Sequence, residues 1–315
     1  MSRKPRRKME VKKIFIPISQ LATYINENPY GNLSQILSGL WMKVDFNSYS
    51  QKLVQLEQKT GRCFKALTEW ELMMELCDFF GLDLKERIKD SMKNSESRGD
   101  LKRNQRALIR DVNQISVQTA EDQEKKTKLC SLITSFTNRG YGTQHEDSAV
   151  DLYSKQTGAV VSDQQKKVVK KIVTSQSPPV EWNLIGKIDG LATFKDGSQK
   201  IVEIKNRTTR LFGVLKGYEK PQIQSYLKLT GHNEGHLVES LNIDKAKTPY
   251  GRQREIKIIP VTYEPEYWNF LKTRMAGFVN FFGDFLKNDQ LQDLVLMGPN
   301  QQGEELLKGL LGTYF

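Results

Sequence analysis

The stretch that decides the fold runs from Trp182 to Lys205, reading WNLIGKIDGLATF at 182–194 and KIVEIK at 200–205, around a Lys-Asp-Gly turn. Apolar and polar residues alternate on both sides of this turn, which predicts two antiparallel strands joined as a β-hairpin. If the loop has three residues with Gly197 in the left-handed region, positions 189 and 203 stand opposite each other, because each lies seven residues from position 196.

The predicted hairpin gathers charged side chains on one face. Alternation along a strand places Glu203 and Lys205 together beside Asp189 and turns Ile204 toward the core. Two nearby carboxylates repel unless a cation lies between them, and Mg²⁺ is a hard cation that prefers oxygen ligands. A lysine beside such an ion stabilises a developing phosphorane charge or helps to deprotonate water. The pattern therefore predicts phosphodiester hydrolysis, with a solvated hairpin bearing an exposed Glu-x-Lys face as the alternative.

An ordered set of motifs extends this pattern: Asp189, then Glu203-Ile204-Lys205 after a short hairpin, then Gln222 and Tyr226. The first pieces resemble the signature of the PD-(D/E)xK nuclease superfamily. The last pair resembles the Gln-x-x-x-Tyr motif of its lambda-exonuclease and RecB-like branch. The resemblance covers roughly residues 130 to 287. It implies an α/β fold with a restriction-endonuclease-like core, in which helices flank a mixed central sheet, and a mainly helical N-terminal region.

The resemblance also implies a site with one or two Mg²⁺ or Mn²⁺ ions. The implied metal ligands are three acidic side chains and one carbonyl: Glu146, Asp189, Glu203 and Ile204. Lys205 would activate or orient the water, while Gln222 and Tyr226 would order the water and the substrate.

Glu146 lies at the start of a helix predicted from about 144 to 157, after a glycine-rich turn and before a C-cap at Gly158. Thr143-x-x-Glu146 also fits a capping box, in which Glu146 would only satisfy backbone donors. The resemblance favours the metal role. His145, directly before it, is the weaker alternative ligand.

Cations and aromatic residues alternate in the segment that follows the predicted catalytic strand. The cations are Arg207, Arg210, Lys216 and Lys220, and the aromatics are Phe212 and Tyr218. Cations pair with phosphates and rings stack on bases, so this segment is predicted to bind nucleic acid, with a flexible surface loop as the alternative. Arg139, upstream of the Glu146 helix, is assigned to a terminal 5′-phosphate, and a structural arginine stays open.

Composition and pattern divide the 315 residues into four parts. We predict a basic flexible tail at 1–13, a mainly helical region with a polar linker at 14–125, the nuclease core at 126–290 and a C-terminal tail at 291–315. The polar residues 84–128 are interpreted as a linker, with an exposed helix as the alternative. Residues 161–175 fit either a helix or a strand.

The charge of the chain favours a polyanionic partner. The net charge is +11, and residues 1–13 hold seven Lys or Arg and one Glu, which fits a solvated tail, a phosphate contact or a nuclear-import signal. The mean hydropathy of −0.56 and the lack of a long apolar run predict no membrane span. Three widely spaced cysteines favour reduced thiols in an intracellular setting, with cytoplasm and nucleus both open.

We therefore expect a metal-dependent deoxyribonuclease, exonuclease-like, that acts on single- or double-stranded DNA in repair, recombination or replication. A recombination or replication protein is a candidate partner, and the oligomeric state, cleavage polarity and exo- or endonucleolytic mode are open. Two alternatives remain: an RNA endonuclease on the same core, and a catalytically inactive nucleic-acid-binding protein.

Overall fold

The computed structural model describes residues 11–61, 68–95, 98–176, 179–243, 253–298 and 300–315. Residues 1–10 of the predicted tail and Cys63 lie outside these ranges. Cys77 and Cys130 are free thiols.

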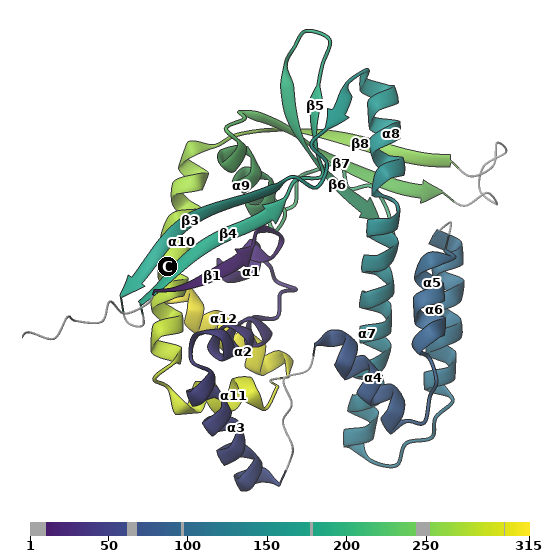
Figure 1. The fold of residues 1–315 in the computed structure, drawn as a ribbon. Helices are drawn as coiled ribbons and strands as arrows, with labels where there is room; N and C mark the ends of the chain where they lie inside the picture. Colours follow the sequence, from purple (N-terminus) through teal and green to yellow (C-terminus); the bar gives the residue numbers. More distant parts are fainter. Residues whose placement is uncertain (1–10, 62–67, 96–97, 177–178, 244–252, 299) are drawn as a thin grey trace, which may run out of the picture.

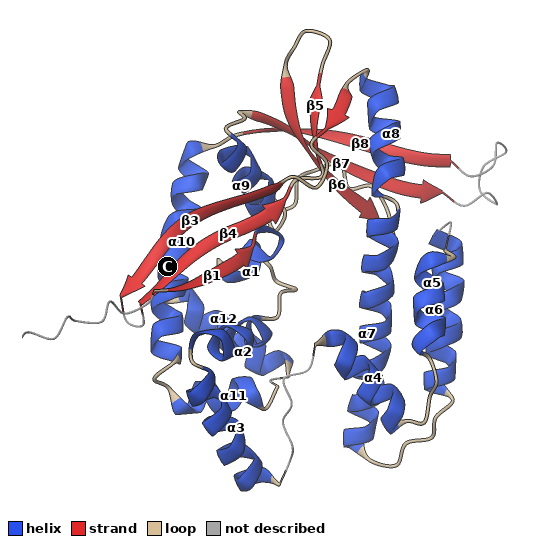
Figure 2. Cartoon of the chain, in the orientation of Figure 1, coloured by secondary structure: helices blue, strands red, loops and turns tan. Residues whose placement is uncertain are grey.

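The described strands form two sheets (Figures 1 and 2). They are β1 (Lys12–Pro17), β2 (Val160–Ser162), β3 (Lys167–Gln176), β4 (Pro179–Lys187), β5 (Gly190–Thr193), β6 (Gln199–Arg207), β7 (Glu234–Ile243) and β8 (Gln253–Thr262). The three-stranded sheet has the order β1-β4-β3, and the five-stranded sheet has the order β2-β5-β6-β7-β8. Strands β1 and β4 run parallel, as do β6 and β7, while the other neighbours are antiparallel. Residues 161–175 are thus mainly strand.

Helices cover both sheets and extend away from them. They are α1 (Leu21–Tyr24), α2 (Leu33–Val44), α3 (Phe46–Thr60), α4 (Glu69–Phe79), α5 (Lys85–Lys93), α6 (Arg98–Asn113), α7 (Ala120–Gln144), α8 (Glu146–Thr157), α9 (Lys220–Thr230), α10 (Pro265–Phe285), α11 (Asp289–Leu296) and α12 (Gln301–Gly312). Helices α9 and α10 lie behind the three-stranded sheet, and α8 packs on the five-stranded one (Figure 1). Mixed sheets flanked by helices, with helices α1–α7 between β1 and β2 in the chain, confirm the predicted fold class.

The predicted hairpin and its register are confirmed. Gly190 pairs with Val202 and Thr193 with Gln199, which is the predicted register, although the ladder begins at Gly190 and Asp189 lies one residue before it. Phe194 N donates to Ser198 O at 2.9 Å, which closes a three-residue loop, and Gly197 has a φ of 83°. This conformation is open to glycine without a steric penalty.

Buried apolar residues form separate clusters. The largest joins the three-stranded sheet to α2, α9, α10 and α12, and includes Trp41, Trp182 and Phe282. A second cluster lies within helices α4–α7, which we call the helical arm, and contains Met73, Leu108 and Ile133. The arm stands apart from the α1–α3 helices in Figure 1. Residues 12–60 therefore pack with the sheets, while residues 69–144 bury an apolar core of their own.

Three expectations about chain segments are wrong. Residues 84–128 are not a linker, because α5, α6 and the start of α7 occupy most of this segment. The predicted glycine-rich turn before Glu146 lies inside α7, which ends at Gln144. The last residues were expected to be a peripheral tail with a short helix, but they form two helices, α11 and α12, and Leu307 and Leu311 are fully buried in the main cluster.

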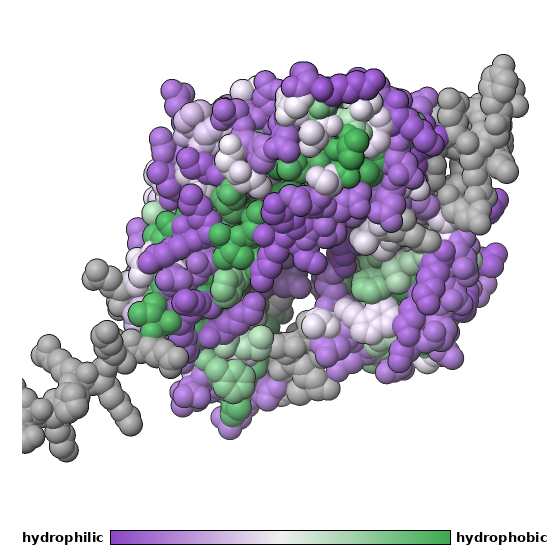
Figure 3. All heavy atoms as spheres, turned by 45° about the horizontal axis from the view of Figure 1, so that its top comes forward, coloured by the Kyte–Doolittle hydropathy of each residue, from purple (hydrophilic) through white to green (hydrophobic). Residues whose placement is uncertain are grey.

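The face seen in Figure 3 is mostly hydrophilic, and it is hollowed between the helical arm and the rest of the molecule. Among the helices that the structure describes, we find none with the length and apolar character needed to cross a membrane.

Candidate active site

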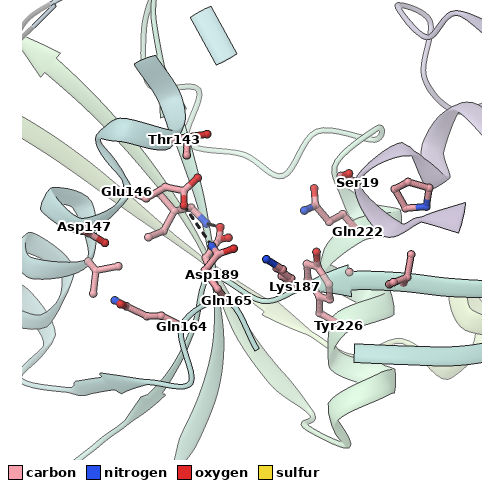
Figure 4. A pocket seen from close by; sticks show the side chains of 15 residues that line it. Ser19, Thr143, Glu146, Asp147, Gln164, Gln165, Lys187, Asp189, Gln222 and Tyr226 are labelled. Carbon is pink, nitrogen blue, oxygen red and sulfur yellow. Dashed lines mark hydrogen bonds between the residues drawn. The ribbon is translucent and has the colours of Figure 1, made fainter. Parts of the chain in front are cut away.

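A cavity of about 500 Å³ lies where β4 gives way to β5, beside the start of α8 and α9. Predicted site residues line it from several elements: Glu146, Asp189, Ile204, Gln222 and Tyr226. In Figure 4, Glu146 and Asp189 lie on one side of this cavity and Gln222 and Tyr226 on the other. The structure therefore brings together residues that are up to 80 positions apart, counting from 146 to 226.

Asp189 occupies the irregular step between the two strands. Strand β4 ends at Lys187 and β5 begins at Gly190, so the backbone of Asp189 lies outside the ladder of either strand. Its Oδ2 accepts a hydrogen bond of 2.7 Å from the backbone N of Ile204. A Cβ at Gly190 would lie 2.5 Å from Val161 Cγ1, so glycine at this position lets β5 approach its neighbour β2 closely. The hydrogen bond from Ile204 N holds the Asp189 carboxylate against β6.

Lys205 links the β6 carboxylate to α9. Its Nζ donates to Glu203 Oε1 at 2.8 Å and to Gln222 Oε1 at 2.8 Å. Glu203 is only 2% exposed, and its second oxygen, Oε2, is buried without a hydrogen-bond partner among the described residues. A buried carboxylate oxygen without a partner is costly, so this atom is suited to a ligand.

Glu146 is the first residue of α8. Its N-cap, His145, makes no side-chain cap, so the capping-box alternative for Glu146 is not observed. Glu146 Oε2 accepts a long hydrogen bond of 3.4 Å from Gln165 Nε2. The junction with α7 is held on the sheet, since Asn206 Nδ2 donates to Gly142 O at 2.7 Å and Arg254 donates to His145 O at 3.0 Å. The carboxylate is thus placed at the cavity by backbone anchoring.

The site favours protonated carboxyl groups in the absence of a cation. Burial raises the pKa of Glu203 to about 8, assisted by Asp189 and opposed by Lys205. Burial raises the pKa of Glu146 to about 7, and the nearby Asp189 adds to this. Burial also raises the pKa of Asp189, against the Ile204 hydrogen bond. Burial lowers the pKa of Lys205, but the nearby carboxylates of Glu203, Asp189 and Glu219 together raise it above its usual value.

The carboxylates do not already form a closed metal shell. Within the described ranges, no three His, Cys, Asp or Glu side chains come together as a group that could hold a metal ion. Glu203 Oε1 is instead directed to Lys205, and Asp189 Oδ2 to a backbone amide. The donor chemistry nevertheless fits a hard cation, because Glu203 Oε2 has no partner and the carboxyl groups raise one another's pKa.

Tyr226 is 2% exposed and packs in the main core while lining the cavity. Burial, followed by the nearby Glu203, raises its pKa. A Cβ at Gly186 would lie 2.8 Å from Tyr226 Cε1 and 2.9 Å from its Oη. Gly186 therefore makes room for the tyrosine ring beside β4.

The cations predicted to bind nucleic acid divide into two groups. Arg139 lies inside α7 and forms an ion pair with Glu69, and Lys220 pairs with Glu264 at 2.8 Å. Arg207 is held by Glu219 and Glu239. Each of these three is paired with a carboxylate. Arg210 and Lys216 gather on the Phe212 ring, 5.2 and 4.1 Å from its centroid.

Some lining residues were not predicted as site residues. Lys187 lines the cavity two positions before Asp189, and the strand alternation that placed Glu203 and Lys205 together signals this position too. Gln164 and Gln165 also line it, from a turn in which Gln165 has a φ of 60°. Nothing in the local pattern predicts that turn.

No family model and no curated protein matches the chain. Among solved structures, it is similar to an alkaline exonuclease, LHK-Exo, from Laribacter hongkongensis, with 18% identity and a TM-score of 0.30 over 58% of this chain and 88% of that one. LHK-Exo in complex with dAMP gives 16% identity and a TM-score of 0.32 over 64% and 87%. A structure of SSO0001 gives 12% identity and a TM-score of 0.30 over 73% and 84%.

Proposed function

We propose that this chain is a metal-dependent nuclease that hydrolyses DNA phosphodiester bonds, in an exonuclease-like manner. The observation that carries the proposal is the buried Glu203 Oε2, which has no partner among the described residues, on a carboxyl group whose pKa responds to the charges of Lys205, Asp189 and Glu146. A fold-stabilising cluster would satisfy this atom, whereas a cation site needs it free.

The acidic residues would hold Mg²⁺ or Mn²⁺, as one or two ions, together with the carbonyl of Ile204. A bound cation would neutralise the carboxylates and polarise a phosphoryl oxygen of the substrate. Glu146 and Asp189 line the cavity from one side, so they define where the scissile phosphate would lie.

The remaining site residues would orient the reactants. Lys205 carries a positive charge held between Glu203 and Gln222, and it would stabilise the negative charge that develops on the phosphate. Gln222 would fix the direction of the Lys205 ammonium. Tyr226, neutral because burial raises its pKa, would offer a hydroxyl donor from the cavity wall.

This activity would serve DNA repair, recombination or replication, in an intracellular setting. An RNA endonuclease with the same site is the second candidate. It shares the chemistry and differs in substrate, so hydrolysis of matched DNA and RNA strands separates the two.

The test is cleavage of end-labelled single- and double-stranded DNA, with and without a 5′-phosphate, in Mg²⁺, Mn²⁺ and EDTA. We expect cleavage that needs the metal and is lost by at least a hundredfold in Glu203→Ala and Lys205→Ala. Lys195→Ala, in the exposed loop of the same hairpin, is the matched control and keeps full activity. Retained DNA binding in both inactive variants shows that the fold survives.

Cleavage that persists in both Glu203→Ala and Lys205→Ala would refute the site assignment. Binding without any metal-dependent cleavage by the unaltered chain would instead support the inactive nucleic-acid-binding alternative. The pattern of labelled products, single nucleotides or longer fragments, decides between exonuclease and endonuclease modes.

A further inference from the structure

A second cavity, of about 380 Å³, lies between the edge strand β3, the end of α9 and the start of α10. Four lysines contribute to its lining: Lys170, Lys171, Lys228 and Lys272. Its other walls include Tyr263, Trp268 and Asn269, and no aspartate or glutamate is among the described residues that line it. We call this cavity the lysine groove.

The charges of the lysine groove are mostly uncompensated. Lys171 Nζ lies 3.6 Å from Glu181 Oε2, and Lys228 Nζ lies 5.4 Å from the centre of the Tyr263 ring. Across the described part of the chain, Lys170, Lys228 and Lys272 have no carboxylate within 4.0 Å. Like charges around one cavity raise the local positive potential, which attracts an anionic ligand.

Strand β3 connects the lysine groove with the catalytic cavity. Its first residue, Lys167, pairs with Lys187, which lines the catalytic cavity, and Lys170 lies three residues further along, opposite Leu184. Since a strand rises about 3.3 Å per residue, the two sites are separated by about 10 Å along β3. Lys167 and Lys170 are both exposed, and because they are three residues apart they carry positive charge on the two faces of this edge strand.

We propose that the lysine groove binds the phosphate backbone of a single strand of nucleic acid that leads to or from the catalytic cavity. This inference rests on the proposed nuclease function and adds a substrate-binding path to it. A cavity of this volume admits one nucleotide-sized ligand but not a duplex. Lysine ammonium groups are point charges that contact phosphates without reading bases, so binding is independent of sequence.

Binding is tested by fluorescence anisotropy, with labelled oligothymidylate in EDTA, where no cleavage occurs, over a range of salt concentrations. The test variant is Lys170→Gln/Lys228→Gln/Lys272→Gln. Its matched control is Lys43→Gln/Lys85→Gln/Lys155→Gln, which removes three exposed lysines that line neither cavity. Each phosphate contact contributes about 0.7 to the slope of log K against log salt, so we expect the test variant to lose about 2 from the slope.

Equal slopes in the two triple variants would overturn the proposal. A larger loss of affinity for a duplex than for a single strand would overturn the single-strand assignment. If the triple variant misfolds, as near-UV circular dichroism would show, Lys170→Gln and Lys272→Gln alone each carry the test, because both side chains are exposed. Each is then expected to lower the slope by about 0.7.

Hydrolysis of a small phosphodiester, bis(p-nitrophenyl) phosphate, separates this inference from the proposed function. This substrate is too short to occupy both cavities, so we expect the lysine variant to hydrolyse it at the unaltered rate, within twofold. If the unaltered chain cleaves neither this compound nor DNA, the nuclease proposal fails. The difference in salt slope would still support the groove as a strand-binding site.

Discussion

Two clusters of buried charges lie side by side on strand β6, and they differ in how completely their atoms are paired. In the anchor cluster, Arg207 lies between Glu219 and Glu239. Its Nε donates to Glu239 Oε1 at 2.7 Å, and its Nη1 donates to Glu219 Oε1 at 2.7 Å. Glu239 Oε2 also accepts from Gly213 N at 2.6 Å. The charged groups of this cluster are thus satisfied from within the chain.

The residues proposed as catalytic form the second cluster, which we call the catalytic cluster. Its one ammonium, that of Lys205, contacts Glu203 and acts electrostatically on Asp189 and Glu146. One buried oxygen there has no partner among the described residues, and the pKa of Glu203 rises to about 8. On β6 the two clusters are only two positions apart, at Lys205 and Arg207. Pairing from within therefore marks the cluster that holds the fold, and incomplete pairing marks the one that suits a ligand.

Removing the anchor cation gives the largest expected effect. Arg207→Ala would leave Glu219 and Glu239 buried without the ion-pair partner that they share, and breaking a buried pair in this way costs about 3–5 kcal/mol. Urea unfolding, followed by circular dichroism, measures the loss. Arg210→Ala, three positions along and exposed, is the control, with an expected change below about 0.5 kcal/mol.

A loss in Arg207→Ala no greater than in the control would show that the anchor cluster does not stabilise the fold. The second variant Arg207→Ala/Glu239→Gln sharpens the reading. Glu239→Gln neutralises one of the two carboxylates left without a partner, so it is expected to recover part of the lost stability, because less negative charge then stays buried.

The catalytic cluster predicts a pH dependence of stability in EDTA. The pKa of Glu203 and Glu146 rises from 4.5 in the unfolded chain to about 8 and about 7 in the fold. The folded state therefore binds more protons between these values. Its stability is fully present below about pH 4.5 and declines as the pH rises toward 8, with at most about 1.4 kcal/mol per pH unit from each group.

Urea unfolding between pH 5 and pH 8.5 measures this slope. Mn²⁺ is expected to flatten it, because a bound cation favours the ionised carboxylates, and Glu203→Gln is expected to reduce it. A stability that stays level or increases across this range without metal would mean that the catalytic carboxyl groups are not perturbed as described.

Much of the fold near the site follows from local pattern. The register of the hairpin depends on Gly197 and on alternation, both of which are visible in the sequence, and the end of α9 is set by Gly231 with a φ of 78°. Pro221 at the start of α9 and the spacing of Gln222 and Tyr226 likewise predict a helix with both side chains toward one region.

The rest depends on contacts between distant residues. Arg207 pairs with Glu239, which lies 32 positions further along the chain on another strand. The local sequence shows only the neighbouring cations Arg210 and Lys216, so it could not predict this ion pair. Residues 84–128 are rich in charge, and their helices are stabilised by apolar contacts with α7 across the arm. Local polarity thus predicted a linker where long-range packing makes helices.

The proposed catalytic site depends on close packing as well as on charge, at the contact between Gly186 and Tyr226. Gly186→Ala would place a methyl group 2.8 Å from the Tyr226 ring, so the ring or β4 must shift. Overpacking of this kind costs about 1–3 kcal/mol. We expect a lower cleavage rate as well. Tyr226→Ala by itself destabilises the core, so the test is additivity: if the ring is the obstacle, Gly186→Ala costs less stability in the Tyr226→Ala background than in the unaltered chain. Unfolding free energies of both single variants and the double variant check this.

The smallest effect is expected at Lys216, which shares a ring with Arg207. Both cations lie over Phe212, with Lys216 Nζ at 4.1 Å and the Arg207 guanidinium at 5.0 Å from its centre. Lys216→Gln removes a cation–π contact but leaves no carboxylate among the described residues without its ion-pair partner. The free energy of unfolding of this variant should therefore change by less than about 1 kcal/mol. A loss of unfolding free energy comparable to that of Arg207→Ala would mean that the anchor cluster stabilises the fold mainly through contacts with the Phe212 ring. A small loss would mean that the anchor cluster stabilises the fold mainly through the ion pairs of Arg207 with Glu219 and Glu239. These complete ion pairs distinguish the anchor cluster from the incompletely paired catalytic cluster on the same strand.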